Sequence, residues 1–241
     1  MKLIPEWYEH QYCLIAWPCN KDLYGKIINK ARDEVANVIN EIAKTEHVIV
    51  FSNKEDINEI QNKTDHKNID IVECKLDDSW MRDIAPIFYI EDEKLKSISF
   101  EFNGYGKYPD YLNDNKISKF ISNYLNIPTK ISDLVIEGGA ITYDDKKNLF
   151  STKNVIFNKN RKQKHNSEYI IKELKLLFDL NYIFLFENGL MEDDTDGHVD
   201  NLLCPIGKNQ YLIATTHKLD PNYKILEKNK ADLIKFFRDT N

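Results

Sequence analysis

One short stretch, residues 191–201, carries five carboxylates and a single histidine, with the imidazole at His198 and the last carboxylate at Asp200. Carboxylates accept hydrogen bonds from cations, and an imidazole exchanges protons near neutral pH. The composition therefore predicts a site for cation binding or proton transfer. The stretch runs into an apolar segment, residues 199–204, that has the composition of a strand. Because side chains two positions apart share one face of a strand, His198 and Asp200 are expected to lie together.

Two other polar turns also contain carboxylate residues. One is residues 77–83, which hold Trp80 and Asp83, and the other begins at Glu137 and continues with two glycines. Asp83 and Glu137 are 54 positions apart, and Glu137 and His198 are 61 positions apart. Near-equal spacing of this size is typical of repeated supersecondary units.

The elements that must position these turns repeat as well. Each turn is followed by two strands and a helix, and the first two copies close with another strand. The expected strands are residues 11–17, 47–51, 69–74, 86–90, 96–102, 130–136, 140–143, 149–152, 182–187, 199–204 and 210–215. The expected helices are residues 22–44, 56–61, 115–126, 166–177 and 223–237. This alternation predicts an α/β class with stacked or propeller-like repeats, whose equivalent turns meet around one axis.

If the turns meet, the carboxylates of Asp83, Glu137 and Asp200 surround one site that also contains His198. Two opposed carboxylates match a planar guanidinium, which donates paired hydrogen bonds to each of them. The indole of Trp80 is expected to form an aromatic wall beside the cation. The sequence thus predicts a guanidinium site with a proton carrier next to it.

Each of these residues also has a plainer interpretation. Trp80 could belong to the core, Asp83 could form a surface ion pair, and Glu137 could merely begin a hairpin. Asp193 and Asp194 are interpreted as part of a solvated acidic loop. The stretch also resembles part of a calcium loop, but its twelfth position falls on Leu203 rather than on a bidentate glutamate, so no metal site is expected.

The composition excludes several classes of function. With 241 residues, a net charge of −6 and a pI near 5.6, the chain has no general basic field for nucleic acid. Its densest basic run, residues 159–164, is interpreted as a solvated loop. No segment has the length and apolar character of a membrane span or a signal peptide, so a cytoplasmic protein is expected. The cysteines show no paired spacing and are expected to be reduced, mostly buried thiols; they are Cys13, Cys19, Cys74 and Cys204.

The three turns together resemble the motifs of agmatine deiminases and the related bacterial peptidylarginine deiminases. The similar segments are WMRDIAPIF at residues 80–88, EGGAI at 137–141 and DTDGHVD at 194–200. Weaker matches are PEW at residues 5–7, AWP at 16–18 and FNGYGKY at 102–108. The resemblance extends over essentially the whole chain.

This resemblance implies an α/β propeller (pentein) of ββαβ repeats with the active site on its axis. By the same resemblance Asp83 and Asp200 hold the substrate guanidinium, His198 is the general acid/base, Glu137 orients or tunes His198, and Trp80 lines the pocket. The implied substrate is agmatine, which is hydrolysed to N-carbamoylputrescine and ammonia in polyamine (putrescine) biosynthesis. No cofactor is implied, and a homo-oligomer is compatible with the family's tendency to associate.

The chemistry of the family starts with a cysteine thiolate that attacks the guanidinium carbon and forms a thiouronium intermediate. In the family this cysteine lies near the C-terminus in a glycine-rich segment, and none of the four cysteines here has that context. Cys204 is expected to be buried and inert. We therefore expect residues 1–241 to form one deiminase-like domain that is incomplete at the C-terminus, lacks the last propeller units and lacks the nucleophile.

The alternatives are a catalytically dead remnant, a guanidino-compound-binding protein, and a deiminase of peptidyl or free arginine.

Overall fold

The computed structural model describes residues 1–240, which form two compact units. The larger unit contains Met1–Tyr8, Ala85–Pro109 and the chain from Ser118 onward, and the smaller unit contains Glu9–Ile84 and Asp110–Ile117. The sequence-based prediction of a single domain stays a prediction. None of the helices in the described residues combines the length and the apolar composition that a membrane span needs.

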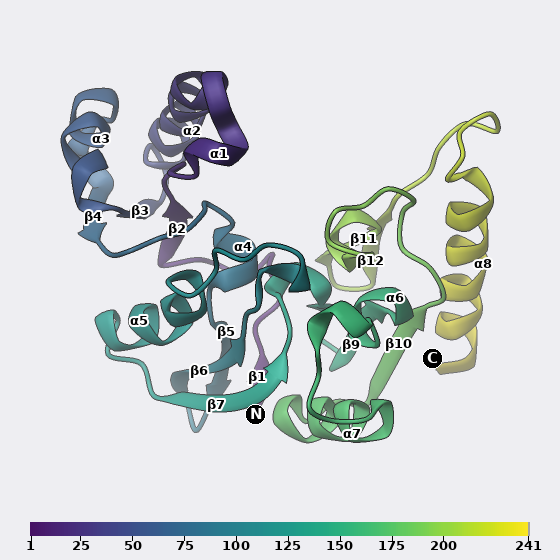
Figure 1. Ribbon diagram of the computed structural model, residues 1–241. Coiled ribbons are helices and arrows are strands. Elements are labelled where there is room, and N and C mark those ends of the chain that lie inside the picture. The colour runs from purple at the N-terminus through teal and green to yellow at the C-terminus, as the bar shows by residue number, and fades with distance from the viewer. Residues whose placement is uncertain (241) are drawn as a thin grey trace. The chain divides into compact units, whose positions relative to one another are not determined.

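The larger unit is built from the predicted repeats (Figure 1). In each of the first two copies an antiparallel hairpin is followed by a helix and then by a strand parallel to the second hairpin strand. The first copy and the N-terminal strand β1 form a sheet with the strand order β1-β5-β6-β7. The second copy forms a sheet with the order β10-β9-β8. A third hairpin, β11-β12, precedes the last helix. The prediction of ββαβ units is therefore confirmed.

The elements of the larger unit have the following bounds. The strands are β1 (Lys2–Leu3), β5 (Ile87–Glu91), β6 (Lys94–Glu101), β7 (Thr129–Val135), β8 (Thr142–Tyr143), β9 (Asn148–Thr152), β10 (Tyr182–Phe186), β11 (Leu203–Gly207) and β12 (Gln210–Ile213). The helices are α5 (Ile117–Tyr124), α6 (Lys153–Ile156), α7 (Ser167–Phe178) and α8 (Tyr223–Thr240).

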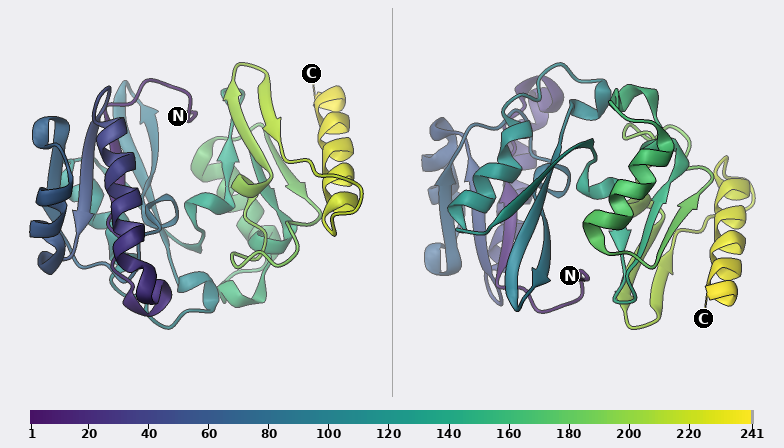
Figure 2. Two further views of the ribbon diagram at one scale, coloured as in Figure 1. Left: turned by 90° about the horizontal axis from the view of Figure 1, so that it is seen from above. Right: turned by 90° about the horizontal axis from the view of Figure 1, so that it is seen from below.

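Neighbouring repeats bury their apolar faces against each other, as repeat proteins require. Helix α7 begins where the Asn166 side chain accepts the Tyr169 N–H, and it buries Ile170, Leu174 and Phe178, which are four residues apart. These side chains share one core cluster with residues of β5, β6, β7 and β9. Helix α8 packs its Leu226 and Leu233 on the next cluster and runs alongside β10 (Figure 2). This shared core fixes the ends of the strands, from which the polar turns project.

The smaller unit is a parallel three-stranded sheet with helices (Figure 1). Its sheet has the order β2-β3-β4, and α2 and α3 contact β3 and β4 respectively. The strands are β2 (Tyr12–Ala16), β3 (His47–Ser52) and β4 (Ile69–Glu73), and the helices are α1 (Lys21–Tyr24), α2 (Ile28–Ile42), α3 (Ile57–Lys63) and α4 (Met81–Ile84). Its core contains Trp17, Ile39 and Val50, all with no exposed surface.

Two sequence-based predictions of secondary structure were wrong. The helix expected at residues 22–44 is interrupted at Gly25, whose φ of +49° lies in the region that glycine adopts without steric cost. The strand expected at residues 199–204 begins only at β11, because Val199–Asn201 is a 3-10 turn. The alternation of side chains along a strand therefore does not explain how His198 and Asp200 are placed.

Candidate active site

Glu137 occupies a buried position two residues after the end of β7. It precedes the 3-10 turn Gly138–Ala140, in which the Ala140 N–H bonds to the Glu137 carbonyl. The Glu137 side chain is 1% exposed. A carboxylate this deeply buried requires charged or hydrogen-bonding neighbours, so its partners define the site.

His198 is placed by the carboxylate of Asp193. That carboxylate accepts the backbone N–H groups of Thr195, Gly197 and His198 at 2.9, 2.9 and 3.1 Å, and the Thr195 hydroxyl at 2.6 Å. Partial burial raises the pKa of Asp193, but these hydrogen bonds outweigh it and hold that pKa below its usual value. The interpretation of Asp193 as a solvated residue was therefore wrong, whereas Asp194 is exposed as expected.

The His198 ring lies between two of the predicted carboxylates. Its Nε2 is 3.5 Å from Glu137 Oε2, and its Nδ1 is 4.0 Å from Asp200 Oδ1. The Tyr105 ring stands edge-on to the imidazole, with 5.8 Å between the ring centroids. The imidazole is buried, while about a third of the Asp200 side chain is exposed. The structure thus brings together Glu137, His198 and Asp200, with one carboxylate near each nitrogen of the imidazole.

Arg161 is a buried residue of the site that the sequence analysis missed. Its Nε lies 2.8 Å from Glu137 Oε1, and its Nη1 lies 2.8 Å from Asp196 Oδ2. Nη1 also donates to the Tyr105 carbonyl at 3.0 Å, and Nη2 donates to the Thr195 carbonyl at 2.6 Å. The side chain is only 1% exposed. The interpretation of residues 159–164 as a solvated loop was therefore wrong for Arg161.

The loop that holds Lys107 contacts both Asp196, a partner of Arg161, and the loop that holds Arg161. Lys107 places its Nζ 2.7 Å from Asp196 Oδ1, and it donates to the Asp194 carbonyl at 2.7 Å. Gly106 has a φ of +69°, and a Cβ atom there would lie 1.8 Å from the carbonyl oxygen of Asn160. Only glycine therefore permits the loop that holds Lys107 to approach the loop that holds Arg161 this closely.

The carboxylates of the calcium-like loop are already engaged. Asp193 binds backbone N–H groups, and Asp196 binds Lys107, Arg161 and the Asn160 amide. Burial raises the pKa of Asp196, but the hydrogen bonds from these side chains and the charge of Lys107 outweigh it and hold that pKa below its usual value. Oxygen atoms that already accept hydrogen bonds and ion pairs are poor calcium ligands, which disfavours the calcium alternative on physical grounds.

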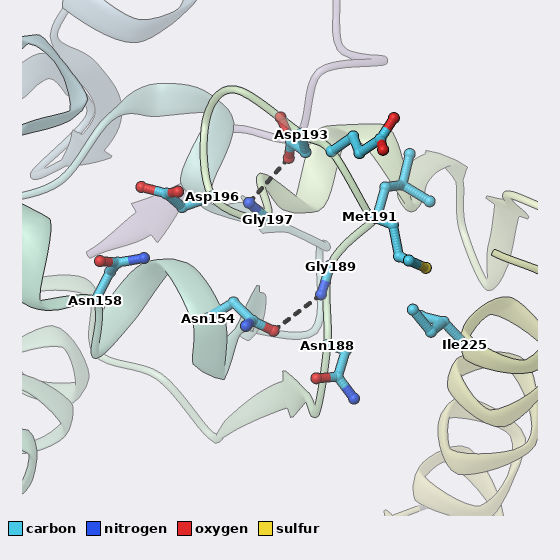
Figure 3. Close-up of a pocket in the computed structure, with 11 residues that line it drawn as sticks. Asn154, Asn158, Asn188, Gly189, Met191, Asp193, Asp196, Gly197 and Ile225 are labelled. Atoms are coloured by element: carbon cyan, nitrogen blue, oxygen red, sulfur yellow. Dashed lines mark hydrogen bonds between the residues drawn. The ribbon is translucent and has the colours of Figure 1, made fainter. Parts of the chain in front are cut away.

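A polar pocket of about 330 Å³ lies beside the turn that precedes His198 (Figure 3). Several of its polar groups already have partners. Asn154 accepts the Gly189 N–H at 3.1 Å, and Asp193 accepts the Gly197 N–H. Its lining includes Asn158, Asn188, Met191, Asp196 and Ile225, but not Glu137, His198 or Asp200. The candidate active site is therefore assigned from the charged groups and not from this pocket.

The remaining predicted residues, Trp80 and Asp83, belong to the smaller unit. The indole of Trp80 is 47% exposed and donates to Asp78 Oδ2 at 3.1 Å, and Asp83 is buried. The interpretations of Trp80 as core and Asp83 as a surface residue were therefore wrong. The buried Asp114 carboxylate holds this segment by accepting the backbone N–H groups of Asp77 and Asp78 at 2.9 and 3.1 Å. The prediction that Trp80 and Asp83 share a site with His198 stays a prediction.

The cysteines of the described residues are free thiols. Burial, followed by the charges of nearby carboxylates, raises the pKa of Cys19 to about 12 and also raises the pKa of Cys13. Burial and the Asp114 charge raise the pKa of Cys74 to about 12. Cys74 is buried, whereas Cys13, Cys19 and Cys204, the last of them in β11, are only partly buried, so the prediction of mostly buried thiols was wrong. Because the thiolate is the nucleophilic form, Cys13, Cys19 and Cys74 are poorly suited to nucleophilic attack.

Comparisons with known proteins agree with the repeat architecture. A family model described as Porphyromonas-type peptidyl-arginine deiminase matches residues 2–241. An agmatine deiminase of Pseudomonas aeruginosa is 30% identical over 226 residues, which are 90% of this chain and 61% of that relative. The chain spans 61% of the length of that relative and 68% of the length of a putative agmatine deiminase of Legionella pneumophila.

Solved structures give the same result. A Cys-to-Ser variant of C. jejuni agmatine deiminase with substrate bound matches with a TM-score of 0.89 and 28% identity, over 98% of this chain and 71% of that one. An agmatine deiminase of Enterococcus faecalis has the same fold, with a TM-score of 0.91 at 20% identity, over 97% of this chain and 66% of that one. These matches confirm the predicted α/β propeller (pentein) class. The chain therefore belongs to the Porphyromonas-type peptidyl-arginine deiminase family.

Proposed function

We propose that this chain binds the guanidinium group of agmatine and takes part in its hydrolysis to N-carbamoylputrescine and ammonia. The observation that carries the proposal is the buried His198 imidazole between the carboxylates of Glu137 and Asp200. The agmatine deiminases among its relatives support the choice of substrate.

Each group has a defined task in the proposed reaction. Asp200, with its partly exposed carboxylate, accepts paired hydrogen bonds from the guanidinium, and Asp83 and Trp80 are proposed to complete the binding site. The proposed task of the His198 imidazole, which lies between the carboxylates of Glu137 and Asp200, is to give a proton to the departing nitrogen.

The proposed chemistry proceeds in two steps. A thiolate forms a bond to the guanidinium carbon, one C–N bond breaks, and the leaving nitrogen takes the His198 proton and departs as ammonia. Water then adds to the thiouronium carbon while His198 removes one of its protons. The C–S bond breaks as the remaining hydroxyl proton leaves to solvent, which yields the ureido product and the thiolate. We propose that none of the four cysteines here is this thiolate.

Calorimetric titration of agmatine tests the proposed binding site. Putrescine is the matched ligand, because it keeps two positive charges but has no guanidinium group. We expect agmatine to bind the chain and putrescine to bind much more weakly. Asp200→Asn should weaken agmatine binding by about 10- to 100-fold, because a hydrogen bond to a charged group contributes about 1.5–3 kcal/mol.

Asp232→Asn is the control variant. Asp232 forms an exposed ion pair with Lys228 on α8, so its replacement should leave agmatine affinity unchanged. Equal affinities of wild type and Asp200→Asn would remove Asp200 from the site, and equal binding of agmatine and putrescine would contradict guanidinium recognition.

A second candidate function is binding of guanidino compounds without turnover. The raised pKa values of Cys13, Cys19 and Cys74 favour it for residues 1–241 taken alone. We therefore expect the 241-residue chain to bind agmatine but to release no ammonia from it. Ammonia release that is lost on replacing one of its four cysteines would show that this cysteine is the nucleophile and would contradict the proposal.

A further inference from the structure

We propose that Arg161 is a positioning residue that sets the orientation of Glu137 and thereby controls the protonation of His198. This inference rests on the proposed function for its catalytic meaning, but its geometry is independent of any substrate. The proposal starts from the two carboxylate oxygens of Glu137, which have different neighbours. Glu137 Oε1 faces Arg161 Nε at 2.8 Å, whereas Oε2 faces His198 Nε2 at 3.5 Å.

The Arg161 guanidinium makes three hydrogen bonds through Nη1 and Nη2, and its Nε forms a close ion pair with Glu137 Oε1 that lacks hydrogen-bond geometry. Besides Glu137, the guanidinium contacts Asp196 Oδ2 and donates to the carbonyls of Tyr105 and Thr195. The two carbonyls belong to two loops next to His198: the Tyr105 ring stands edge-on to the imidazole, and Thr195 lies three positions before His198 in the same turn. A planar, multiply bonded guanidinium has little freedom to rotate. Arg161 therefore joins the acid/base pair to both loops rather than merely neutralising one charge.

The charges around His198 explain why the position of Glu137 matters. The ring faces Glu137 from the end of β7, Asp200 from its own turn, and the uncharged Tyr105 ring from the neighbouring loop. Asp193 accepts the His198 backbone N–H, and the charge of His198 contributes to the lowered pKa of Asp193, so this carboxylate also acts on the imidazole. The cation nearest to Glu137 is Arg161. With Arg161 in place, the charge of Glu137 is shared between a guanidinium and the imidazole, which limits how strongly it holds the imidazolium.

Lysine at position 161 cannot reproduce this arrangement. An ammonium group is a point charge and cannot bridge Glu137, Asp196 and two carbonyls simultaneously. In Arg161→Lys we expect Glu137 to lose part of its competing partner and to pair more strongly with His198. The titration midpoint of the His198 ring should then rise by about one pH unit, which is at the low end of the shifts that a nearby opposite charge produces.

Asp196→Asn should have the opposite effect. It removes the second carboxylate that shares Arg161, while the amide oxygen can still accept from Nη1. Arg161 then pairs more completely with Glu137, and the midpoint of His198 should fall by about half a pH unit. A purely structural role of Arg161 would lower the melting temperature of both variants without moving the midpoint in opposite directions.

The experiment is an NMR titration of the histidine rings in the absence of ligand. The chain has six histidines, and His198→Gln identifies the His198 signal. Arg238→Lys, at an exposed position on α8, is the matched control and should leave that midpoint unchanged. Circular dichroism checks that each variant is folded.

A rise in Arg161→Lys together with a fall in Asp196→Asn supports the proposal, and an unchanged or lower midpoint in Arg161→Lys overturns it. If Arg161→Lys does not fold, Asp196→Asn is compared with Asp194→Asn, which removes an exposed carboxylate of the same loop. A larger fall in Asp196→Asn supports the proposal, and an equal fall or no change overturns it. A chain that fails to bind agmatine would contradict the proposed function but would leave this titration result intact.

Discussion

Glu137 and Glu91 allow the buried ion pair of the site to be compared with a more exposed one. Both lie in the larger unit and both contact a cation, Glu137 at 2.8 Å from Arg161 and Glu91 at 2.7 Å from Lys96. The Glu137 and Arg161 side chains are each 1% exposed, whereas those of Glu91 and Lys96 are 28% and 21% exposed. The same substitution, Glu→Gln, removes the charge at either position and keeps the shape of the side chain.

The expected loss of stability at Glu137 follows from its burial. Removal of one partner from a buried ion pair costs about 3–5 kcal/mol, because the other charge stays buried without compensation. Arg161 keeps Asp196 and two carbonyls, so we expect the lower end, about 3 kcal/mol. For a chain of this size that loss corresponds to a decrease of about 6–12 °C in melting temperature.

Thermal unfolding followed by circular dichroism measures this difference. Glu91→Gln should change the melting temperature by only a small fraction of the Glu137→Gln effect, because solvent screens the pair at Glu91. Melting temperatures that agree within about 2 °C for the two variants would refute the interpretation of Glu137 and Arg161 as a buried, mutually compensating pair.

Three further predictions concern other parts of the chain. Burial raises the pKa of Asp114 from 3.8 to about 7, so the folded state binds this proton more tightly than the unfolded state. The free energy of unfolding should therefore fall as the pH rises from about 4 to 7. The difference in melting temperature between pH 5 and pH 8 should be smaller in Asp114→Asn than in wild type. Cys19 and Cys74, whose pKa values are raised to about 12, should react with iodoacetamide at pH 8 much more slowly in the folded chain than in urea, and equal rates would contradict their assignment as inert thiols. Asp83→Asn should weaken agmatine binding by about 10-fold in calorimetry, and an unchanged affinity would exclude Asp83 from the guanidinium site.

The repeated units could be predicted because their signals are local. The apolar period of α7 and the short apolar runs of β9 and β10 each reveal one element, and the polar turns at Glu137 and His198 mark where units begin. The contact between Glu137 and His198 follows from that architecture. Its prediction needed no knowledge of individual side-chain contacts.

The internal geometry of the His198 turn could not be predicted in this way. Asp193 captures the backbone N–H groups of Gly197 and His198, and Val199–Asn201 then forms a 3-10 turn in place of the start of a strand. Side-chain capture of backbone groups competes with regular structure, and counting apolar periods does not detect it. His198 and Asp200 are neighbours for this reason and not because of strand alternation.

Arg161 could not be identified from its surroundings in the sequence. Charged residues in a polar, lysine-rich run are usually exposed, so the local composition predicts a solvated loop. Its partners Tyr105, Glu137 and Asp196 lie 24 or more positions away in the chain. The one available signal is the FNGYGKY segment of the family resemblance, which contains Tyr105 and Lys107.

The central claim, that a guanidinium binds beside His198, is tested most directly by NMR of the histidine rings during an agmatine titration. We expect the His198 signal to shift and saturate with agmatine, while the ring of His165, which pairs with Asp133, stays unchanged. Putrescine at the same concentrations should leave the His198 signal in place. An unchanged His198 signal at agmatine concentrations that saturate binding by calorimetry would contradict the claim.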